Sequence, residues 1–374
     1  MIGQKGIAPH AGGVEKHVEE IGARLAARGH EVDVFCRAHY TDLRGTHRGM
    51  RVVMRPAIHT KHLDALSHAV AATLSSFGRG YDVIHYHALG PTTLSPVARL
   101  PGARVVSTCH GLDWRREKWG PVAQAMLRAA EWPSARFPHR LIAVSRGLAE
   151  YFRARYGADA VHIPNGFDAP ERLSPPEAIR ARWNLGAPDQ DGAFVLFLSR
   201  LVPEKGAHTL IEAFRRVESP LRLVVAGGSS HSDDTVRRLH ALAAGDRRVL
   251  FVGPVAGAEW SELLSNARLF VLPSTLEGLP IVLLEAMGHG RSCLASDIPE
   301  NLEIVEPEPG GPRYARTFRA GDAADLAGAI GGALADPEAV ERGRRAREMV
   351  RARFGWDAIA GRVEEVYREL LERR

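Results

Sequence analysis

The sequence predicts an α/β protein built from two doubly wound domains. Short β-branched runs alternate with amphipathic stretches along the chain, which is the pattern of strands and helices in parallel sheets. The alternation stops in a stretch rich in Pro, Gly and charge at residues 167–192 and then restarts. The length of 374 residues suits two domains of average size. We therefore expect two such domains that face each other across a cleft.

The first half begins with a strand-like start, Met1 to Gln4, that is too short for a central strand. A helix should follow it, with Val14, Val18, Ile21 and Leu25 on one face. Further strands are predicted at residues 31–36, 50–55, 82–87, 103–110, 140–145 and 161–164.

The second half restarts with a strand at residues 193–200 and a helix at 208–217. Further strands are predicted at residues 221–228, 249–253 and 268–274, with a final strand at 293–296. Mostly helical spacing follows over residues 322–353 and again over 356–374. We expect domains at residues 1–170 and 193–353, a linker at 171–192 with one helical turn, and a separate C-terminal helix at 354–374.

The composition is that of an ordinary soluble protein, with 45% hydrophobic and 25% charged residues. No apolar run reaches membrane-spanning length and no secretory leader is evident, so we expect a cytoplasmic protein. Cys36, Cys109 and Cys293 match no disulfide or zinc spacing. The net charge of +5 suits an anionic substrate, a phospholipid surface or mere solubility. Nucleic acid is disfavoured because no binding motif accompanies that charge.

The segment PSTLEGLPIVLLEAMGHG is the most informative in the chain. It follows an apolar strand, turns through Gly278 and Pro280, and enters a helix whose first amides would suit a diphosphate. Glu277 and Glu285 cannot bind phosphate, so hydroxyl groups are their natural partners. A phosphate between hydroxyl-rich groups describes a nucleotide sugar. The alternative is a capping glutamate and a solvated helix glutamate.

The segment FLSRLVPEKGAHTL places two cations after a predicted strand. Arg200 would give a bidentate phosphate contact, Lys205 a point charge, and Gly206 a close backbone approach. The two cations could neutralise a leaving diphosphate without a metal. Surface salt bridges of Lys205 to Glu204 or Glu212 are the alternative.

Three features of the first half have weaker signals. Gly12 and Gly13 resemble a phosphate-approach loop without a full dinucleotide motif. His110 follows a predicted strand and could contact a sugar hydroxyl, whereas His85 and His87 are interpreted as structural. Asn165 and Gly166 would form a hinge, or simply a turn.

A basic and aromatic segment follows His110. It suits a bilayer interface or an anionic acceptor, and an exposed basic helix is the alternative. Its residues are Trp114, Arg115, Arg116, Lys118 and Trp119.

Together these segments resemble the family 4 retaining glycosyltransferases of the GT-B fold, over nearly the whole chain. The resemblance is greatest to bacterial members that build surface polysaccharides, judged by HAGGVEKHVEE, HGLDWRREKWG, AVSRGLAEYF and IPNGFD. The two glutamates of EGLPIVLLE, with seven residues between them, and SRLVPEKG are the most specific marks.

The resemblance implies a role for each candidate residue. Glu277 would contact donor-sugar hydroxyls, Glu285 the ribose, and His110 the sugar near the reacting carbon. Arg200 and Lys205 would hold the diphosphate. The remaining donor-binding candidates are Gly12, Gly13, Gly278, Leu279, Pro280, Gly253 and Val255.

The resemblance also implies transfer with retention from a nucleotide sugar to a saccharide or lipid-linked saccharide. No metal or cofactor is expected, no covalent nucleophile is evident, and the final helix would cross back to the first domain. Three rival functions predict different behaviour. A glycoside hydrolase would need no nucleotide, a sugar-nucleotide epimerase would need no acceptor, and a binding module would not turn over.

Overall fold

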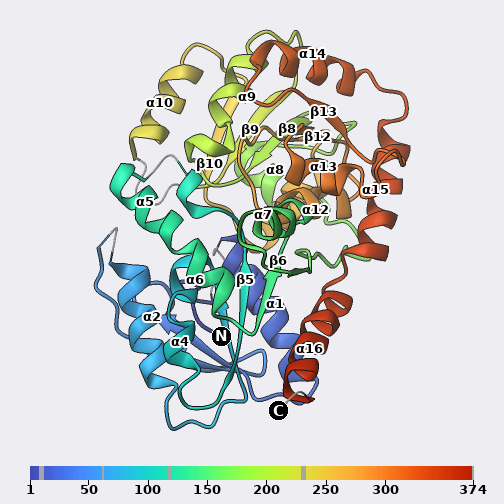
Figure 1. Ribbon diagram of the computed structural model, residues 1–374. Coiled ribbons are helices and arrows are strands. Elements are labelled where there is room, and N and C mark those ends of the chain that lie inside the picture. Colours follow the sequence, from blue (N-terminus) through green and yellow to red (C-terminus); the bar gives the residue numbers. More distant parts are fainter. Residues whose placement is uncertain (8–11, 61–62, 117–118, 229–232, 373–374) are drawn as a thin grey trace. The chain divides into compact units, whose positions relative to one another are not determined.

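The computed structural model describes residues 1–7, 12–60, 63–116, 119–228 and 233–372 (Figure 1). The chain forms two compact units. Unit 1 comprises Met1–Gly166 and Trp356–Arg374, and unit 2 comprises Phe167–Gly355. The chain therefore leaves unit 1 once, completes unit 2, and returns to unit 1 with its last helix.

Unit 1 contains two groups of strands that the N-terminal residues join. Ile2 pairs in parallel with Tyr86, and Phe35 donates its amide to the carbonyl of Met1. The segment predicted to be too short for a central strand thus occupies the central position as a single bridge. The strand orders are β1-β3-β2 and β4-β5-β6-β7. Their bounds are β1 Asp33–Arg37, β2 Gly45–His47, β3 Met50–Arg55, β4 Val83–His87, β5 Arg104–Cys109, β6 Arg140–Ala143 and β7 Ala160–His162.

The first and last helices of unit 1 pack against each other (Figure 1). Val18, Ile21 and Leu25 of α1 are buried, as their spacing predicts, whereas Val14 is only partly buried. Val363 and Val366 of α16 are buried as well. The helices are α1 Gly13–Ala27, α2 Asp64–Ser75, α3 Leu89–Thr92, α4 Ser95–Ala98, η1 Asp113–Arg115, α5 Pro121–Ala129, α6 Glu131–Arg136, α7 Arg146–Tyr156 and α16 Trp356–Glu372.

Unit 2 contains a six-stranded sheet, all of whose described pairings are parallel. The order β10-β9-β8-β11-β12-β13 reverses direction between β8 and β11, which is the switch point of a doubly wound sheet. The strands are β8 Phe194–Leu198, β9 Arg222–Ala226, β10 Val249–Gly253, β11 Leu269–Leu272, β12 Cys293–Ser296 and β13 Arg316–Phe318.

The helices of unit 2 cover a core of Val, Leu, Ile and Phe side chains from these strands. Leu210, Ile211 and Phe214 of α9 and Leu326 and Ile330 of α14 contribute to it. The helices are α8 Glu177–Trp183, η2 Pro203–Lys205, α9 Ala207–Phe214, α10 Asp233–Ala243, α11 Gly257–Asn266, α12 Ile281–Gly288, α13 Pro299–Val305, α14 Ala323–Leu334 and α15 Ala339–Arg353.

Most predicted elements are confirmed. The structure adds helices between the strands of unit 1 for which no bounds were predicted, such as α2 and α7, and it differs from the prediction in three further places. The strand at residues 293–296 is not the final one, because β13 follows it and pairs with it. A short antiparallel strand, β2, lies between the strands predicted at residues 31–36 and 50–55, where no element was predicted. Residues 177–183 form the helix α8 within unit 2, where only one turn was expected. All three cysteines are free and buried, as expected.

Candidate functional site

The switch point of unit 2 brings two predicted site residues into contact. Lys205 ends η2, the short turn after β8, and Glu277 lies in the loop after the neighbouring strand β11. Lys205 Nζ donates to Glu277 Oε1 at 2.5 Å, and both side chains are largely buried. The edge where parallel strands end at a switch point is where such sheets bind ligands. The pair therefore lies where a ligand is expected.

A glycine permits this contact. Gly206 has φ of 71°, and a Cβ at this position would lie 2.1 Å from the carbonyl oxygen of Pro273. The two loops also share a backbone hydrogen bond from Thr275 N to the carbonyl of Glu204 at 3.0 Å. The close approach holds the loop that contains Lys205 against the loop that leads to Glu277.

A buried network of hydrogen bonds supports the carboxylate of Glu277. Ser274 Oγ donates to Glu277 Oε1 at 2.7 Å. The carbonyl of Ser274 accepts from Ser296 Oγ, and Asn301 Nδ2 donates to Ser296 Oγ at 2.8 Å. Because Ser274, Ser296 and Asn301 are fully buried, the network fixes where the Glu277 carboxylate lies.

The loop after Glu277 leads directly into α12. Gly278 and the buried Leu279 precede Pro280, which occupies the N-cap position. No side chain caps the start of this described helix, so its first amides are available to an anion. Glu285 lies one turn further along and is only 2% exposed. A carboxylate buried to this degree needs partners, which argues against the solvated-glutamate alternative.

The other candidates of unit 2 lie at the ends of neighbouring strands. Arg200 follows β8 and is exposed. Gly253 ends β10 with φ of 73° and accepts a backbone hydrogen bond from Gly227, and Val255 is buried just beyond it. The predicted residues of the second half thus follow the carboxyl ends of β8, β10 and β11 in one sheet, with Glu285 one turn into α12.

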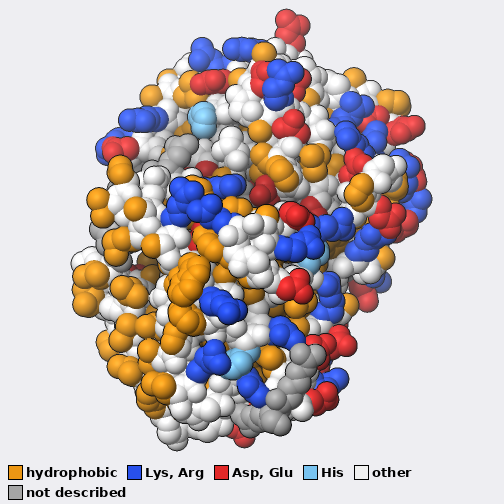
Figure 2. All heavy atoms as spheres, viewed as in Figure 1, with side chains coloured by type: hydrophobic (Ala, Val, Ile, Leu, Met, Phe, Trp, Pro, Cys, Tyr) orange, Lys and Arg blue, Asp and Glu red, His pale blue; other side chains and the backbone are white. Residues whose placement is uncertain are grey.

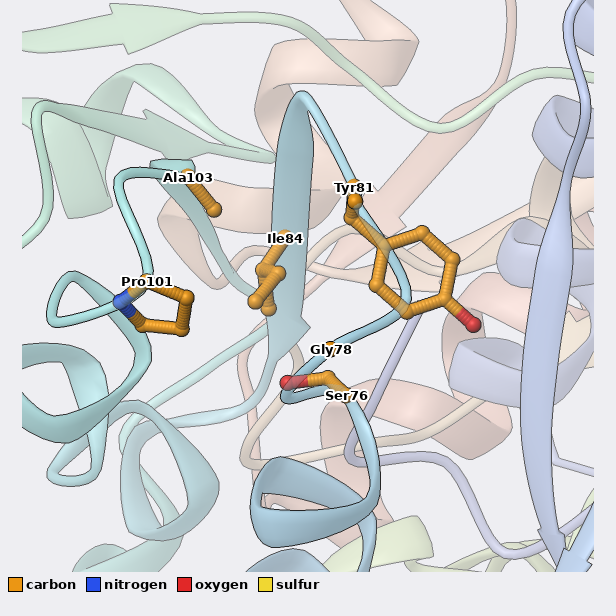
Figure 3. A pocket seen from close by; sticks show the side chains of 7 residues that line it. Ser76, Gly78, Tyr81, Ile84, Pro101 and Ala103 are labelled. Carbon is orange, nitrogen blue, oxygen red and sulfur yellow. The ribbon is translucent and has the colours of Figure 1, made fainter.

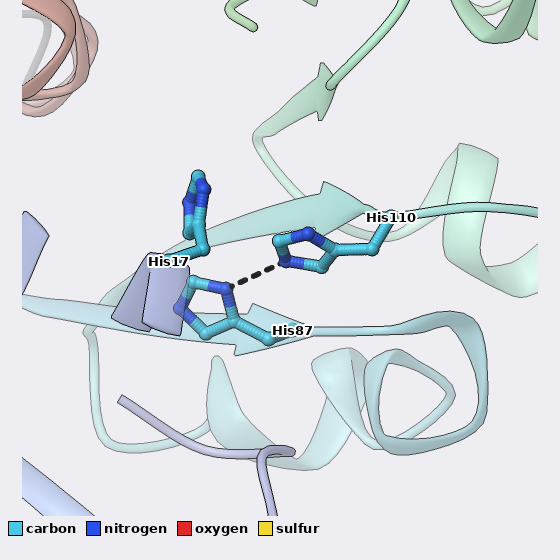
Figure 4. A group of neighbouring side chains, drawn as sticks. All are labelled: His17, His87 and His110. Atoms are coloured by element: carbon cyan, nitrogen blue, oxygen red, sulfur yellow. Dashed lines mark hydrogen bonds between the residues drawn. The ribbon is translucent and has the colours of Figure 1, made fainter. Parts of the chain in front are cut away.

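The candidates of unit 1 lie at the corresponding edge of its own sheet. Gly12 is the N-cap of α1 and Gly13 its first residue, whereas the preceding residues 8–11 lie outside the described residues. His110 follows β5 directly. Its Nε2 lies 3.2 Å from Nδ1 of His87, at the end of β4, and its ring makes an edge contact with that of His17 (Figure 4).

These histidines are neutral. Desolvation, followed by the effect of neighbouring histidines, lowers the pKa values of His87 and His110 well below the ordinary value. Desolvation lowers the pKa of His17 to about 4, against a smaller opposing effect of Asn165. His85 links β4 to α16 instead, through a 2.5 Å hydrogen bond between its Nδ1 and Tyr367 Oη.

The basic and aromatic segment is more firmly packed than an exposed helix. The indole of Trp114 donates to the buried Glu131, and the guanidinium groups of Arg115 and Arg128 lie over its ring. Arg116 pairs with Asp113 at 3.2 Å. Lys118 lies outside the described residues.

A cavity of 310 Å³ lies at the opposite edge of the unit 1 sheet, where β4 and β5 begin (Figure 3). Its lining residues are Ser76, Gly78, Gly80, Tyr81, Ile84, Pro101 and Ala103. None of the predicted site residues lines it, so we do not assign it to the predicted site.

Sequence reasoning missed the neighbours of the candidates. His17 and Ser274 lie within quoted segments, HAGGVEKHVEE and PSTLEGLPIVLLEAMGHG, but were given no role, and His87 was interpreted as structural because a lone histidine is more often structural than functional. The signal that could have found His17 and His87 is topological, because α1 and the ends of β4 and β5 meet at one edge.

Comparison with known proteins gives consistent matches along the chain. Residues 11–170 match the model of Glycosyltransferase Family 4, and residues 192–336 match that of Glycosyl transferases group 1. A glycogen synthase of Mycobacterium tuberculosis is 30% identical over 95% of this chain and 91% of its own length.

Two further proteins span nearly the whole chain. A GDP-mannose-dependent alpha-(1-6)-phosphatidylinositol monomannoside mannosyltransferase of M. tuberculosis is 29% identical, over 96% of this chain and 95% of its own. The structure of a sucrose-phosphate synthase from Thermosynechococcus elongatus superposes with a TM-score of 0.81 at 26% identity, covering 100% of this chain and 96% of that one.

These matches exclude the hydrolase, epimerase and binding-module alternatives, because the relatives are glycosyltransferases. The two parallel-sheet units and the structural neighbours identify the GT-B fold. The chain is a transferase, and it belongs to the family 4 glycosyltransferases.

Proposed function

We propose that the protein transfers a sugar, with retention of anomeric configuration, from a nucleoside-diphosphate sugar to a saccharide or lipid-linked saccharide of the bacterial cell surface. The observation that best supports the donor is the Lys205–Glu277 pair at the switch point of unit 2. It presents a cation for the diphosphate beside a carboxylate for hydroxyl groups.

The hydrogen bonds of Glu277 suggest how it works. Lys205 and Ser274 both donate to Oε1, and among the described residues no hydrogen bond reaches Oε2. Oε2 is therefore suited to accept a hydroxyl of the donor sugar. Glu285 would accept the ribose hydroxyls, and Gly253 and Val255 would flank the base.

The leaving diphosphate gains negative charge as the sugar departs. Arg200, Lys205 and the first amides of α12, beyond Gly278 and Pro280, would stabilise that charge. We therefore propose transfer that needs no metal. His110 would contact the sugar near the reacting carbon, Gly12 and Gly13 would approach the diphosphate, and the leaving oxygen would take the acceptor's proton.

Mutation of the two glutamates tests the donor assignment. Glu277→Ala should lower kcat for transfer by about 10²–10³-fold, because it removes the contact to the sugar hydroxyl and the partner that positions Lys205 for the leaving diphosphate. Glu285→Ala should chiefly weaken nucleotide binding. A thermal-shift screen of UDP, GDP, dTDP and ADP sugars would first identify the donor, and transfer would then be assayed with chelator present.

Glu303→Ala serves as the matched control, since this glutamate of the same unit lies outside the candidate site on α13. Full transfer by both site variants would refute the assignment. NMR of the product's anomeric proton at early times would test retention independently.

A lipid-linked acceptor would require contact with a membrane surface. Among the described residues, no helix is long and apolar enough to cross a bilayer. The contact that we propose is peripheral. Unit 1 exposes Leu66 and Leu74 on α2 and Val122 and Met126 on α5. Hydrophobic side chains gather over α2, α4 and α6 in Figure 2.

The charge of this region suits an anionic surface. Residues 56–136 contain nine Lys or Arg and five Asp or Glu, a net +4 of the chain's +5. Apolar side chains combined with basic residues favour the interface of anionic membranes. We therefore extend the proposed membrane contact from the segment with Trp114, Arg115, Arg116, Lys118 and Trp119 to the exposed residues of α2 and α5.

Vesicle flotation tests this contact. Wild-type protein should float with vesicles that contain phosphatidylglycerol and less with phosphatidylcholine alone. The double variant Val122→Glu/Met126→Glu should float several-fold less, because it places two carboxylates on the apolar face. Val340→Glu, on an equally exposed residue of unit 2, is the control. Equal flotation of all three proteins would refute the contact.

A further inference from the structure

The buried carboxylate of Glu131 gathers three aromatic side chains of unit 1. Glu131 is the first residue of α6 and is fully buried. Its Oε1 accepts a hydrogen bond from the indole of Trp114 on η1, and its Oε2 accepts from Tyr151 Oη at 2.8 Å and Tyr156 Oη at 2.6 Å, both on α7. The elements η1, α5, α6 and α7 pack against one another in succession (Figure 1). The three rings, which we call the aromatic platform, thus turn their polar atoms inward.

Three arginines lie over the rings of the aromatic platform. The Cζ atoms of Arg115 and Arg128 are 5.3 Å and 5.2 Å from the ring centre of Trp114. Arg115 also lies 5.9 Å from the ring centre of Tyr151, and Arg155 lies 5.5 Å from that of the third ring. All three arginines are exposed. Because a guanidinium over an aromatic face is held through the ring, that contact leaves its N–H donors for another partner.

The positive charge of these arginines is not balanced by carboxylates. Among the described residues, neither Arg115 nor Arg128 forms an ion pair or donates a side-chain hydrogen bond. Arg155 lies 3.9 Å from Glu131, whose oxygens already accept from three neutral donors. A planar guanidinium matches the oxygens of a phosphate and binds them bidentately. Three cations around one buried carboxylate thus favour an anionic ligand, and a phosphate or diphosphate in particular.

The arginines lie apart from the apolar side of α5. Val122 and Met126 are four positions apart and share one side of this helix, whereas Arg128 lies about 200° around the helix from Met126. The side of α5 that is proposed to contact a membrane is therefore not the side that carries Arg128. A bilayer against Val122 and Met126 would leave Arg128 facing away from it. The arginines thus suit a phosphate that reaches them on a bound substrate, rather than the headgroups under the helix.

We infer that Arg115, Arg128 and Arg155 form a binding site for the phosphate or diphosphate group of the acceptor, which is thus a phosphate-bearing saccharide. The acceptor role rests on the proposed function, because Arg115 lies five residues after His110 in the same segment. Binding of the anion does not rest on it. The cations assigned to the diphosphate of the donor belong to unit 2, so the two sites use different residues.

Chemical modification of arginine locates the site in the full chain. The wild-type protein is treated with phenylglyoxal in the presence of pyrophosphate, or of sodium chloride at the same ionic strength, and each arginine is followed by peptide mass spectrometry. Pyrophosphate should slow the modification of Arg115, Arg128 and Arg155 several-fold. Arg153 is the internal control, because it is an exposed arginine of α7 that pairs with Glu150 instead. Its modification should be the same in both salts.

Variants measure the affinity of this site alone, through the pyrophosphate concentration that protects Arg155. The double variant Arg115→Gln/Arg128→Gln should weaken binding by about 10–100-fold, since it removes charge-assisted hydrogen bonds. Arg153→Gln is the matched control, because it removes one cation of α7 and should keep the wild-type affinity. Nucleotide binding should be unchanged in the double variant. Conversely, Lys205→Ala should lose nucleotide affinity and keep the protection of Arg155.

Several outcomes would overturn the inference. One is equal modification of the three arginines in pyrophosphate and in chloride, and another is undiminished protection of Arg155 in the double variant. Protection by phosphatidylglycerol vesicles but not by pyrophosphate would identify bilayer headgroups as the ligand instead. None of these readouts measures transfer, so the anion site and the proposed function can fail separately.

A transfer assay with the identified donor tests the acceptor role. Saccharides that carry a phosphate or diphosphate are compared with the same saccharides without it. The wild-type protein should use the phosphate-bearing forms better, through a lower KM, and the double variant should lose that preference with little change in kcat. Equal use of both forms by the wild-type protein would refute the acceptor role.

Discussion

In both units polar residues lie at the carboxyl edge of a sheet, but the charge states of these residues differ. In unit 2, Lys205 and Glu277 form an ion pair that Ser274 supports. In unit 1, His17 and His87 are neutral, and each has a buried ring nitrogen without a hydrogen-bond partner among the described residues. The carboxyl edge of the unit 2 sheet therefore holds a charged pair, and that of the unit 1 sheet holds uncharged imidazoles.

The difference shows what topology does and does not determine. A doubly wound sheet dictates where side chains from successive strands converge. Whether they remain charged depends on local partners, because burial penalises an ion that lacks a counter-ion. The edge of unit 1 suits ligands that supply positive charge or hydroxyl protons. The edge of unit 2 suits a ligand that contains both phosphate and hydroxyl groups.

Acid should destabilise unit 1 before unit 2. The pKa of His17 is lowered from 6.5 to about 4, and those of His85, His87 and His110 are lowered as well. The unfolded chain therefore binds protons below pH 6.5 that the folded cluster does not. Stability is lost as pH falls from about 6.5 toward 4, at about 1.4 kcal/mol per pH unit for each such histidine.

Unit 2 loses stability over a different pH range. The pKa of Asp336 is lowered to about 2 by hydrogen bonds from Arg342, so its contribution is lost only between about pH 4 and 2. Urea titrations at pH 7 and pH 5, read by pulsed hydrogen exchange and peptide mass spectrometry, distinguish the units. Earlier loss of protection in unit 2 at pH 5 would contradict the prediction. His17→Phe should reduce the pH effect on unit 1.

Local sequence patterns predicted most of the secondary structure. β3, β10 and β12 have the predicted bounds, because continuous β-branched or apolar runs leave little ambiguity. β2 and β13 have three residues each, too few for a periodic signal. They exist because neighbouring strands offer unpaired edges, and a sequence pattern does not reveal strand order.

The candidate site shows the same limit. Glu277 and Lys205 were found because each lies in a distinctive segment, but their mutual contact could not be predicted, since 72 residues separate them. Their contact follows from the pairing of β8 with β11. The contact between His87 and His110 similarly follows from the pairing of β4 with β5.

Gly206→Ala should test whether the charged pair of unit 2 depends on the approach of two loops. Alanine would have to adopt φ of 71° and place its Cβ 2.1 Å from a backbone oxygen of Pro273. The strain should destabilise unit 2 by about 1–3 kcal/mol and separate Lys205 from Glu277. We expect weaker nucleotide binding, while unit 1 keeps its protection against hydrogen exchange.

Gly245→Ala provides the matched control. It also has positive φ, 94°, in unit 2, but no atom lies within 4 Å of the added Cβ. If strain alone were responsible, both variants would destabilise the unit and neither would weaken nucleotide binding specifically. Loss of donor affinity in Gly206→Ala alone would show that the loop contact assembles the charged site. Equal affinity in both variants would mean that Lys205 and Glu277 act without it.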